Sequence, residues 1–335
     1  MRILTYVFHR LVILFLAVFG VSIITFVVTR VLPGNPAYLI VGVQADQSTV
    51  DAVIDKLGLD KPVIEQYQLY MKQLFLGDFG NSWRTGNPVS FDLRSRWPAT
   101  IELASIAMIM AMLWAIPLGL ISSIRKRSIS DYVAKFLSGL GVAIPEFWLA
   151  TLLILIFFAG LQIAPAPIGR ILLSSPPEYI TGMYILDSII TGNWQSLRAS
   201  VSQIILPAST LAFTIGAPLL RVTRTFMNDV LDSQYIRSAR AMGIPKISII
   251  FRHAFPNVLL PVSTMIAVLY GYLLGGTVLV EYVFSWPGMG KYAIDSINSS
   301  DYAPVMAVVV LSAVSYLLVY LLTDILHFIV DPRSR

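Results

Sequence analysis

The sequence predicts an all-α integral membrane protein: six transmembrane helices, a small extracytoplasmic domain after the first helix, and a short cytoplasmic helix between the fourth and the fifth. The first reason is composition, because 56% of the 335 residues are hydrophobic and only 13% are charged, too few to cover a soluble protein of this size. The second reason is that six essentially uncharged runs each reach the roughly 20 residues that cross a bilayer. A soluble enzyme is thereby excluded.

The six runs are predicted to be helices. Backbone amides in hydrocarbon need internal partners, and the runs lack the period-2 alternation of a barrel strand. The first run belongs to an N-terminal anchor helix, residues 1–30, which is too long for a signal peptide and has no small-residue cleavage site after it. The runs are Leu11–Thr29, Leu103–Ile124, Phe136–Gly160, Ala199–Leu220, Ala254–Val280 and Tyr302–Thr323.

The distribution of lysine and arginine predicts the orientation. With the N-terminus inside, the four inside segments hold 14 basic residues and the two short outside segments hold three. Because short cytoplasmic loops are enriched in positive charge, we expect a plasma-membrane protein with both termini in the cytoplasm, and no nucleic-acid partner. The inside segments are 1–10, 122–135, 221–253 and 330–335, and the outside segments are 161–203 and 281–301.

Residues 31–99 have an ordinary soluble composition and are predicted to form the extracytoplasmic domain. Ser48 and Asp51 have capping-box spacing, and Gly58 stands where such a helix would stop. A second helix is expected with Pro62 in its first turn. The chain has no cysteine, so disulfides and thiolate metal sites are excluded.

A short helix is predicted in the cytoplasmic segment after residue 221. Asp232 or Ser233 can cap its start, Gly243 can end it in a left-handed turn, and Pro245 prevents its continuation. A helix of about nine residues is marginal alone in water, so it must pack against something else.

One stripe of this short helix is suited to such packing. Tyr235, Ile236, Ala239 and Met242 lie along it, whereas the arginines lie on another face. We therefore expect a helix shaped to lie in the groove of a partner.

The spacing of this segment resembles the E-A-A-x3-G-x9-I-x-L-P loop of ABC-importer permeases. Ala239 matches the second alanine, Gly243 the glycine and Pro256 the final proline, whereas Arg237 replaces the glutamate and Ser238 the first alanine. This variant is similar to the dipeptide/oligopeptide permease subfamily, specifically its B-type subunit. Further matching motifs run along the chain at Val31–Pro36, Leu57–Pro62, Gly77–Ser82, Pro98–Leu103, Ile144–Leu149 and Glu281–Gly290.

The resemblance implies a coupling loop, residues 221–256, within a five-helix permease core, residues 100–335. In such importers the short cytoplasmic helix docks on an ATPase subunit and relays its motion to the membrane helices. The residues that the resemblance assigns to this coupling are Tyr235, Arg237, Ser238, Ala239, Arg240, Met242, Gly243 and Pro256.

The resemblance also implies the partners. They are a second permease subunit of the C type, two ATP-binding subunits, an extracytoplasmic substrate-binding protein and the lipid bilayer. The chain itself is expected to be non-catalytic and to hold no cofactor or metal, because the ATPase subunits bind ATP and Mg²⁺.

One acidic residue in the third run remains open to two interpretations. A carboxylate in a membrane helix is costly and is by default a functional candidate. Glu146, which follows Pro145, could line the translocation pathway or could bond to backbone groups that the proline frees.

Other functions are less favoured. An ion-coupled secondary transporter would normally show internal repeats and several intramembrane acids, and an intramembrane enzyme would need a catalytic pair or metal ligands. The sequence shows neither set. Within the importer interpretation, peptides are the expected substrate, with oligosaccharides, glutathione or nickel chelates as alternatives carried by the same mechanism.

Overall fold

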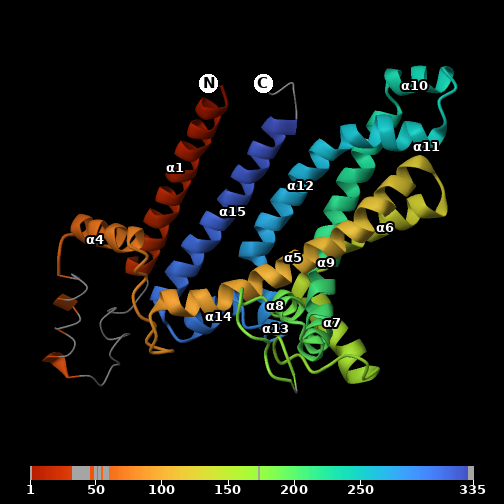
Figure 1. Ribbon diagram of the computed structural model, residues 1–335. Coiled ribbons are helices and arrows are strands. Elements are labelled where there is room, and N and C mark those ends of the chain that lie inside the picture. Colours follow the sequence, from red (N-terminus) through yellow and green to blue (C-terminus); the bar gives the residue numbers. More distant parts are fainter. Residues whose placement is uncertain are drawn as a thin grey trace.

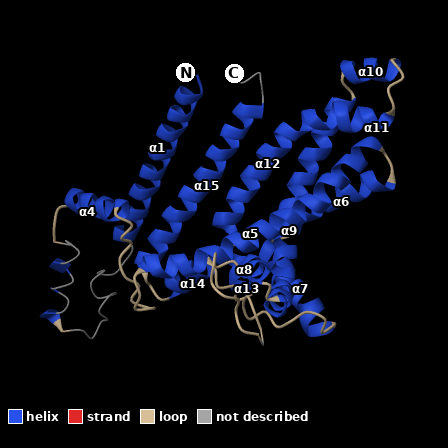
Figure 2. Ribbon diagram, in the orientation of Figure 1, coloured by secondary structure: helices blue, strands red, loops and turns tan. Residues whose placement is uncertain are grey.

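The computed structural model describes residues 2–31, 46–48, 51, 54–55, 60–172 and 174–330. Within these residues every extended regular element is a helix (Figure 1 and Figure 2). The expected helix between Ser48 and Gly58 and the motif Val31–Pro36 lie largely outside the described residues. The helices are α1 (Arg2–Val31), α4 (Val63–Phe75), α5 (Val89–Ile124), α6 (Ile129–Ala143), α7 (Glu146–Leu153), α8 (Tyr184–Thr191), α9 (Trp194–Leu231), α10 (Gln234–Ala241), α11 (Lys246–Ser248), α12 (Phe255–Gly276), α13 (Val278–Val283), α14 (Met289–Asn298) and α15 (Tyr302–Val330).

Five helical segments are long and apolar enough to cross a membrane, and a bent pair brings the number to six if it counts as one span. The predicted class, an all-α protein with membrane-spanning helices, is therefore confirmed. The five are Phe8–Val27, Val89–Ile124, Trp194–Leu231, Lys246–Gly276 and Tyr302–Ile325, and the bent pair is Ile129–Ala143 with Glu146–Gly160.

The third predicted helix is not one straight rod. The chain bends by 105° between α6 and α7, and Ile144 adopts an extended conformation with φ −85° and ψ 124°. Pro145 causes this break, because its ring disfavours the helical conformation of the preceding residue and it lacks the N–H that would continue the ladder. After α7, a π-helical turn over Ile154–Gly160 completes the outgoing arm.

Several helix ends also differ from the expected spans. α5 begins at Val89, so the expected domain boundary at residue 99 falls inside a helix. The 36 residues of α5 extend for about 54 Å, well beyond a hydrocarbon core of about 30 Å. α12 ends at Gly276, and the predicted continuation to Val280 belongs to the separate helix α13.

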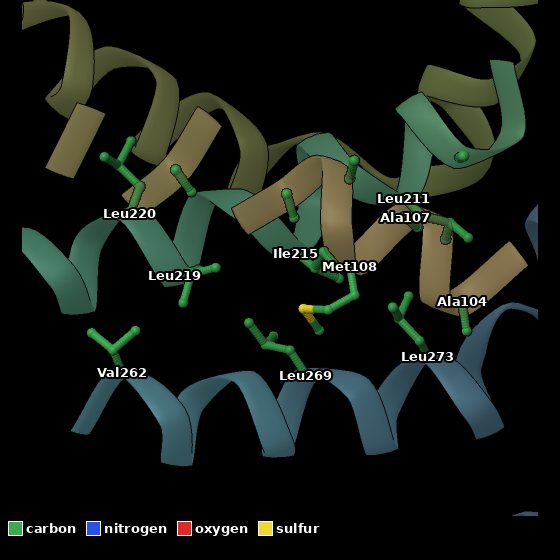
Figure 3. Close-up of a cluster of buried hydrophobic side chains, with 14 of the residues drawn as sticks. Ala104, Ala107, Met108, Leu211, Ile215, Leu219, Leu220, Val262, Leu269 and Leu273 are labelled. Carbon is green, nitrogen blue, oxygen red and sulfur yellow. The ribbon is translucent and has the colours of Figure 1, made fainter. Parts of the chain in front are cut away.

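α9 is the central helix of the bundle. It packs along α5 over most of its length and also contacts α6, α7 and α12. α5 presents alanines to this interface at spacings of three and four residues, which lets the two backbones approach closely. Figure 3 shows α12 completing this core, with Val262, Leu269 and Leu273 directed toward leucines of α9 and Met108 of α5.

The two ends of the bundle are distinct. The start of α1 and the end of α15 lie at the same end as α10 and α11, whereas α4, α8, α13 and α14 lie at the opposite end (Figure 1). We call these the α10 end and the α14 end. At the α14 end, α4 packs on α1 through Tyr67, whose ring contacts Phe19 and Phe26 and whose hydroxyl lies 2.8 Å from that of Ser22.

Candidate functional site

The short helix α10 projects from the end of α9. It ends two residues before Gly243, whose φ of +78° is the left-handed turn that the sequence predicted. Ser233 occupies the N-cap position, one of the two that were predicted, but its hydroxyl makes no capping hydrogen bond and donates to the Val230 carbonyl at 2.5 Å instead. Asp232 also makes no cap; its carboxylate accepts a hydrogen bond from Lys126 at 2.7 Å, which lowers the pKa of Asp232.

The inner face of α10 packs on its own chain. Ile236 is fully buried and Ala239 is 5% exposed, in one cluster with Leu231, Ile249 and Ala254. The predicted stripe is therefore divided: Ile236 and Ala239 are covered by this chain rather than by a partner. A π-helical turn over Ile249–Ala254 supplies this cover and connects the hairpin to α12.

Polar contacts fix the same packing. The Tyr235 hydroxyl lies 3.4 Å from the His253 carbonyl and accepts a hydrogen bond from Asn257 at 3.2 Å. Asn257 also donates to the His253 carbonyl at 2.7 Å. A guanidinium nitrogen of Arg240 lies 3.4 Å from the Leu231 carbonyl. α10 is thus held at both its start and its end against the base of α12 and the end of α9.

The outward side of the hairpin is apolar and basic, and we call it the outer face. Its exposed apolar side chains are Tyr235 (47% exposed), Met242 (73%), Ile247 (73%) and Phe251 (61%). Its other exposed residues are Arg237, Ser238, Arg240, Gly243, Lys246, Arg252 and, at the start of α12, Pro256.

Gly243 lies open on this side. A Cβ there would meet nothing within 4 Å in this chain. The positive φ, rather than internal crowding, is what requires glycine at this position.

A charged cluster ties the neighbouring helices together at the α10 end. The buried Asp131 carboxylate of α6 binds Arg224 of α9 at 2.6 Å and Lys135 at 3.0 Å, and it accepts a hydrogen bond from the Arg127 N–H. A buried acid with two cations and a backbone donor is fully compensated. The end of α9, from which α10 projects, is therefore fixed to α6.

Glu146 lies at the bend, as the first residue of α7. Its Oε1 accepts a hydrogen bond from the Tyr272 hydroxyl of α12 at 3.1 Å. The Thr214 hydroxyl of α9 lies 3.5 Å from the same oxygen but makes its shorter hydrogen bond, 3.0 Å, to the Leu211 carbonyl. The contacts of Glu146 are thus with side chains of other helices, not with the backbone groups that Pro145 frees.

Similarity to known proteins identifies the family. Residues 115–335 match the family described as Binding-protein-dependent transport system inner membrane component, and residues 3–104 match its N-terminal counterpart. The chain belongs to this family. Its relatives include a probable D,D-dipeptide transport system permease protein of Escherichia coli (strain K12), 40% identical over 96% of this chain and 94% of the relative. They also include a dipeptide transport system permease protein of Alkalihalophilus pseudofirmus, 38% identical over 99% of both chains, and an oligopeptide transport system permease protein of Bacillus subtilis (strain 168), 35% identical over 98% of both.

Two buried carboxylates at the α14 end of this inner membrane component were not recognised from the sequence. Glu281 is fully buried and accepts hydrogen bonds from the hydroxyls of Thr100 and Thr277 and from the N–H groups of Gly290 and Lys291, at 2.7 to 3.1 Å. Burial raises the pKa of the Glu281 carboxyl, although these hydrogen bonds act in the opposite direction.

The glycines of the Glu281–Gly290 motif make room for this carboxylate. A Cβ at Gly288 would lie 2.5 Å from the carboxylate oxygens, and one at Gly290 would lie 2.5 Å from the Val278 backbone. In the sequence, an acid followed by two closely spaced glycines is the pattern that could have indicated this buried carboxylate. In the structure, these residues form the tight turn between α13 and α14.

Glu102 is the second unrecognised acid. Glu102 lies well inside α5, which begins at Val89, and so does not stand at a helix start. Glu102 instead binds Arg170 at 2.5 Å and accepts a hydrogen bond from the Ile185 N–H at 2.6 Å. Arg170 also stacks 3.6 Å over the Tyr184 ring. This pair fastens the segment between α7 and α8 onto α5.

Within the described residues, no group of three or more His, Asp or Glu side chains is arranged to hold a metal ion. At each end of the bundle, the charged and polar side chains pair with residues of their own cluster. The outer face and Glu146 are therefore the two candidate functional features.

Proposed function

We propose that this chain is the transmembrane permease subunit of an ATP-driven ABC importer for dipeptides or oligopeptides. It forms the translocation pathway together with a second, C-type permease subunit. Membership in the binding-protein-dependent transport family supports the class, and the dipeptide and oligopeptide transport names of relatives that match nearly the whole chain support the substrate.

The outer face of the α10–α11 hairpin carries the coupling part of the proposal. Tyr235, Met242, Ile247 and Phe251 expose apolar surface in a setting rich in arginine and lysine, as expected for a site that another protein covers. The opposite side of α10 is packed firmly on this chain, because Ile236 and Ala239 are buried there. A helix mounted in this way can pass a push on its outer face to α9 and α12.

Two ATP-binding subunits are the partners that fit this face. They bind ATP and Mg²⁺ and carry out hydrolysis, so this chain has no catalytic residue of its own. The α10 end, with both termini, lies in the cytoplasm in this proposal, because the segments assigned to that side carry most of the basic residues. An extracytoplasmic substrate-binding protein then delivers substrate at the α14 end.

Reconstituted vesicles test the transport class. The chain is purified with the subunits encoded beside it, reconstituted, and supplied with the substrate-binding protein and labelled dipeptide. Uptake that requires ATP on the hydrolase side, and that persists after the proton gradient is collapsed, supports the proposal. Uptake that needs the proton gradient and ignores ATP contradicts it and favours an ion-coupled transporter.

Substitution of Gly243 tests the coupling role. Gly243→Val places a β-branched residue at φ +78°, where such residues are strained, and alters the end of α10. We expect the variant to assemble in the membrane but to lose most ATP-driven uptake while the ATPase subunits still hydrolyse ATP. Both rates are measured on the same preparation.

Gly243→Asn is the matched control, because asparagine tolerates the left-handed conformation. It is expected to retain coupled uptake. Normal uptake by the valine variant would refute the coupling role of this turn.

Glutathione, oligosaccharides and nickel chelates are the alternatives to a peptide substrate, and each would be carried by the same mechanism. A glutathione transport system permease protein of Escherichia coli O1:K1 / APEC is 32% identical over 99% of this chain, which favours glutathione among the alternatives. Oligosaccharides and nickel chelates remain alternatives, and the ligand that the partner binding protein carries distinguishes them.

A further inference from the structure

Glu146 is the least compensated of the buried or half-buried carboxylates that lie among the packed helices. Within the described residues, only the Tyr272 hydroxyl bonds it at less than 3.5 Å, and no cation pairs with it. The corresponding acids elsewhere have cations or several donors: Asp131 binds Arg224 and Lys135, Glu102 binds Arg170, Asp324 binds Arg10, and Glu281 accepts four hydrogen bonds.

The position of Glu146 makes this shortage costly. Thr214, its neighbour on α9, is about 30 Å along the helix from Trp194 and about 26 Å from Leu231, so the carboxylate faces the middle of the longest helix. Water is scarce at such depth in a bilayer, and an uncompensated carboxylate directed toward lipid is strongly disfavoured. A polar pathway or another molecule can supply the partner that the packed helices do not provide.

Tyr272 lies on the exposed side of the site. Its side chain is 47% exposed, and its ring lies against Gly276, where a Cβ would come within 3.0 Å of the ring. The Tyr272 bond and the longer Thr214 contact both reach Oε1, so within the described residues Oε2 accepts no hydrogen bond. A free carboxylate oxygen and an exposed aromatic ring on neighbouring helices can together hold an organic ammonium group.

We propose that Glu146 and Tyr272 bind the cationic group of the transported substrate, which in a peptide is the free α-ammonium. The inference rests on the proposed peptide importer, and it adds a contact within this chain that favours substrates with an amine. A peptide or glutathione carries such a group, whereas a neutral oligosaccharide does not. The bend at Pro145 serves this site, because it turns the first residue of α7 toward α9 and α12.

The absence of cysteine from the chain allows a direct test. Glu146→Cys is introduced in the complete transporter, and the reconstituted complex is treated with thiosulfonate reagents that add either a sulfonate or a trimethylammonium group. We expect the untreated variant to take up dipeptide about tenfold more slowly than the wild type, the effect of losing one charge-assisted hydrogen bond. The sulfonate should restore much of that rate, the trimethylammonium should not, and saturating peptide-loaded binding protein with ATP should slow labelling of this chain.

Two further variants control the test. Glu65→Cys, an exposed acid of α4, should be labelled by both reagents without any change in uptake or any protection by peptide. Glu146→Gln keeps the side-chain shape, and it should lower uptake about tenfold while leaving subunit assembly unchanged, which separates binding from folding.

The inference fails if Glu146→Cys stays unlabelled in every state while Glu65→Cys reacts, because the site is then dry. It also fails if labelling is insensitive to peptide, or if both reagents change uptake equally, since the partner is then another subunit rather than substrate. If the wild-type complex shows no ATP-driven peptide uptake, the proposed function itself fails instead.

Discussion

Asp187 shows how a buried acid outside the membrane spans is kept charged. It lies in α8 and is 1% exposed. It accepts hydrogen bonds from the hydroxyl and the N–H of Thr181, at 2.6 and 2.8 Å, and from the N–H groups of Gly182 and Ile180. Burial acts to raise the pKa of Asp187, but these hydrogen bonds outweigh it and the pKa lies below its ordinary value. The carboxylate thereby closes the loop that precedes α8.

The lowered pKa predicts a pH dependence of stability. The folded state binds this proton less readily than the unfolded state, so the stabilisation is present above the unfolded value of about 3.9 and is lost as the pH falls through the lower folded value. Asp187→Asn should therefore unfold at a lower temperature than the wild type at pH 7, by roughly 1–3 kcal/mol in stability. The difference should shrink below about pH 4.

Thermal unfolding of the detergent-solubilised protein at several pH values measures this effect. A wild type and an Asp187→Asn variant that differ by the same amount at pH 7 and at about pH 3 would contradict it. In that case the loop would depend on the shape of the side chain and not on its charge.

At the scale of elements, close approach of α6 to α9 depends on one glycine. A Cβ at Gly141 would lie 2.5 Å from the Ala217 Cβ and 3.2 Å from the Phe213 carbonyl oxygen. These atoms of α9 cannot move aside as the end of a flexible side chain can. The incoming arm of the bent pair thus lies directly against the central helix, shortly before the chain reaches the Ile144–Pro145 break.

Gly141→Ala should consequently destabilise the bundle by about 1–3 kcal/mol through overpacking. Gly139, in the same helix, is the matched control, because a Cβ there would meet nothing within 4 Å. Gly139→Ala should leave stability unchanged or raise it by up to about 1 kcal/mol, the difference in helix propensity. Thermal unfolding of the two variants in one detergent compares them, and equal stabilities would argue against the close α6–α9 contact.

Across the whole molecule, the membrane helices separate the outer face of the α10–α11 hairpin from the surface at the α14 end. The outer face of the α10–α11 hairpin lies at the same end as the start of α1 and the end of α15, and the glycine-rich turn between α13 and α14 lies at the other end (Figure 1). α9 connects the two ends as a single helix of 38 residues. A displacement of α10 can therefore reach the α14 end through one continuous element.

Single cysteines in this cysteine-free chain test the orientation. Met242→Cys, from a side chain that is 73% exposed, should react with a membrane-impermeant thiol reagent only when the cytoplasmic side is open, as in inverted vesicles. Tyr179→Cys, from a side chain that is 69% exposed near α8, should react in intact cells after the outer surface is made accessible. Labelling of both cysteines from the same side would contradict the proposed topology.

Sequence periodicity, composition and turn residues determined the helical class, the approximate spans and the left-handed turn at Gly243 that follows α10. These features depend on local chemistry: apolar runs that must satisfy their own amides, and a glycine at a positive φ. Tertiary structure decided the covered half of the α10 stripe and the partners of Glu102, Glu281 and Glu146. Arg170, Tyr272 and Thr100 lie 68, 126 and 181 residues along the chain from the acids that they contact, Glu102, Glu146 and Glu281. Only the packing of the helices determines which side chains meet at such separations.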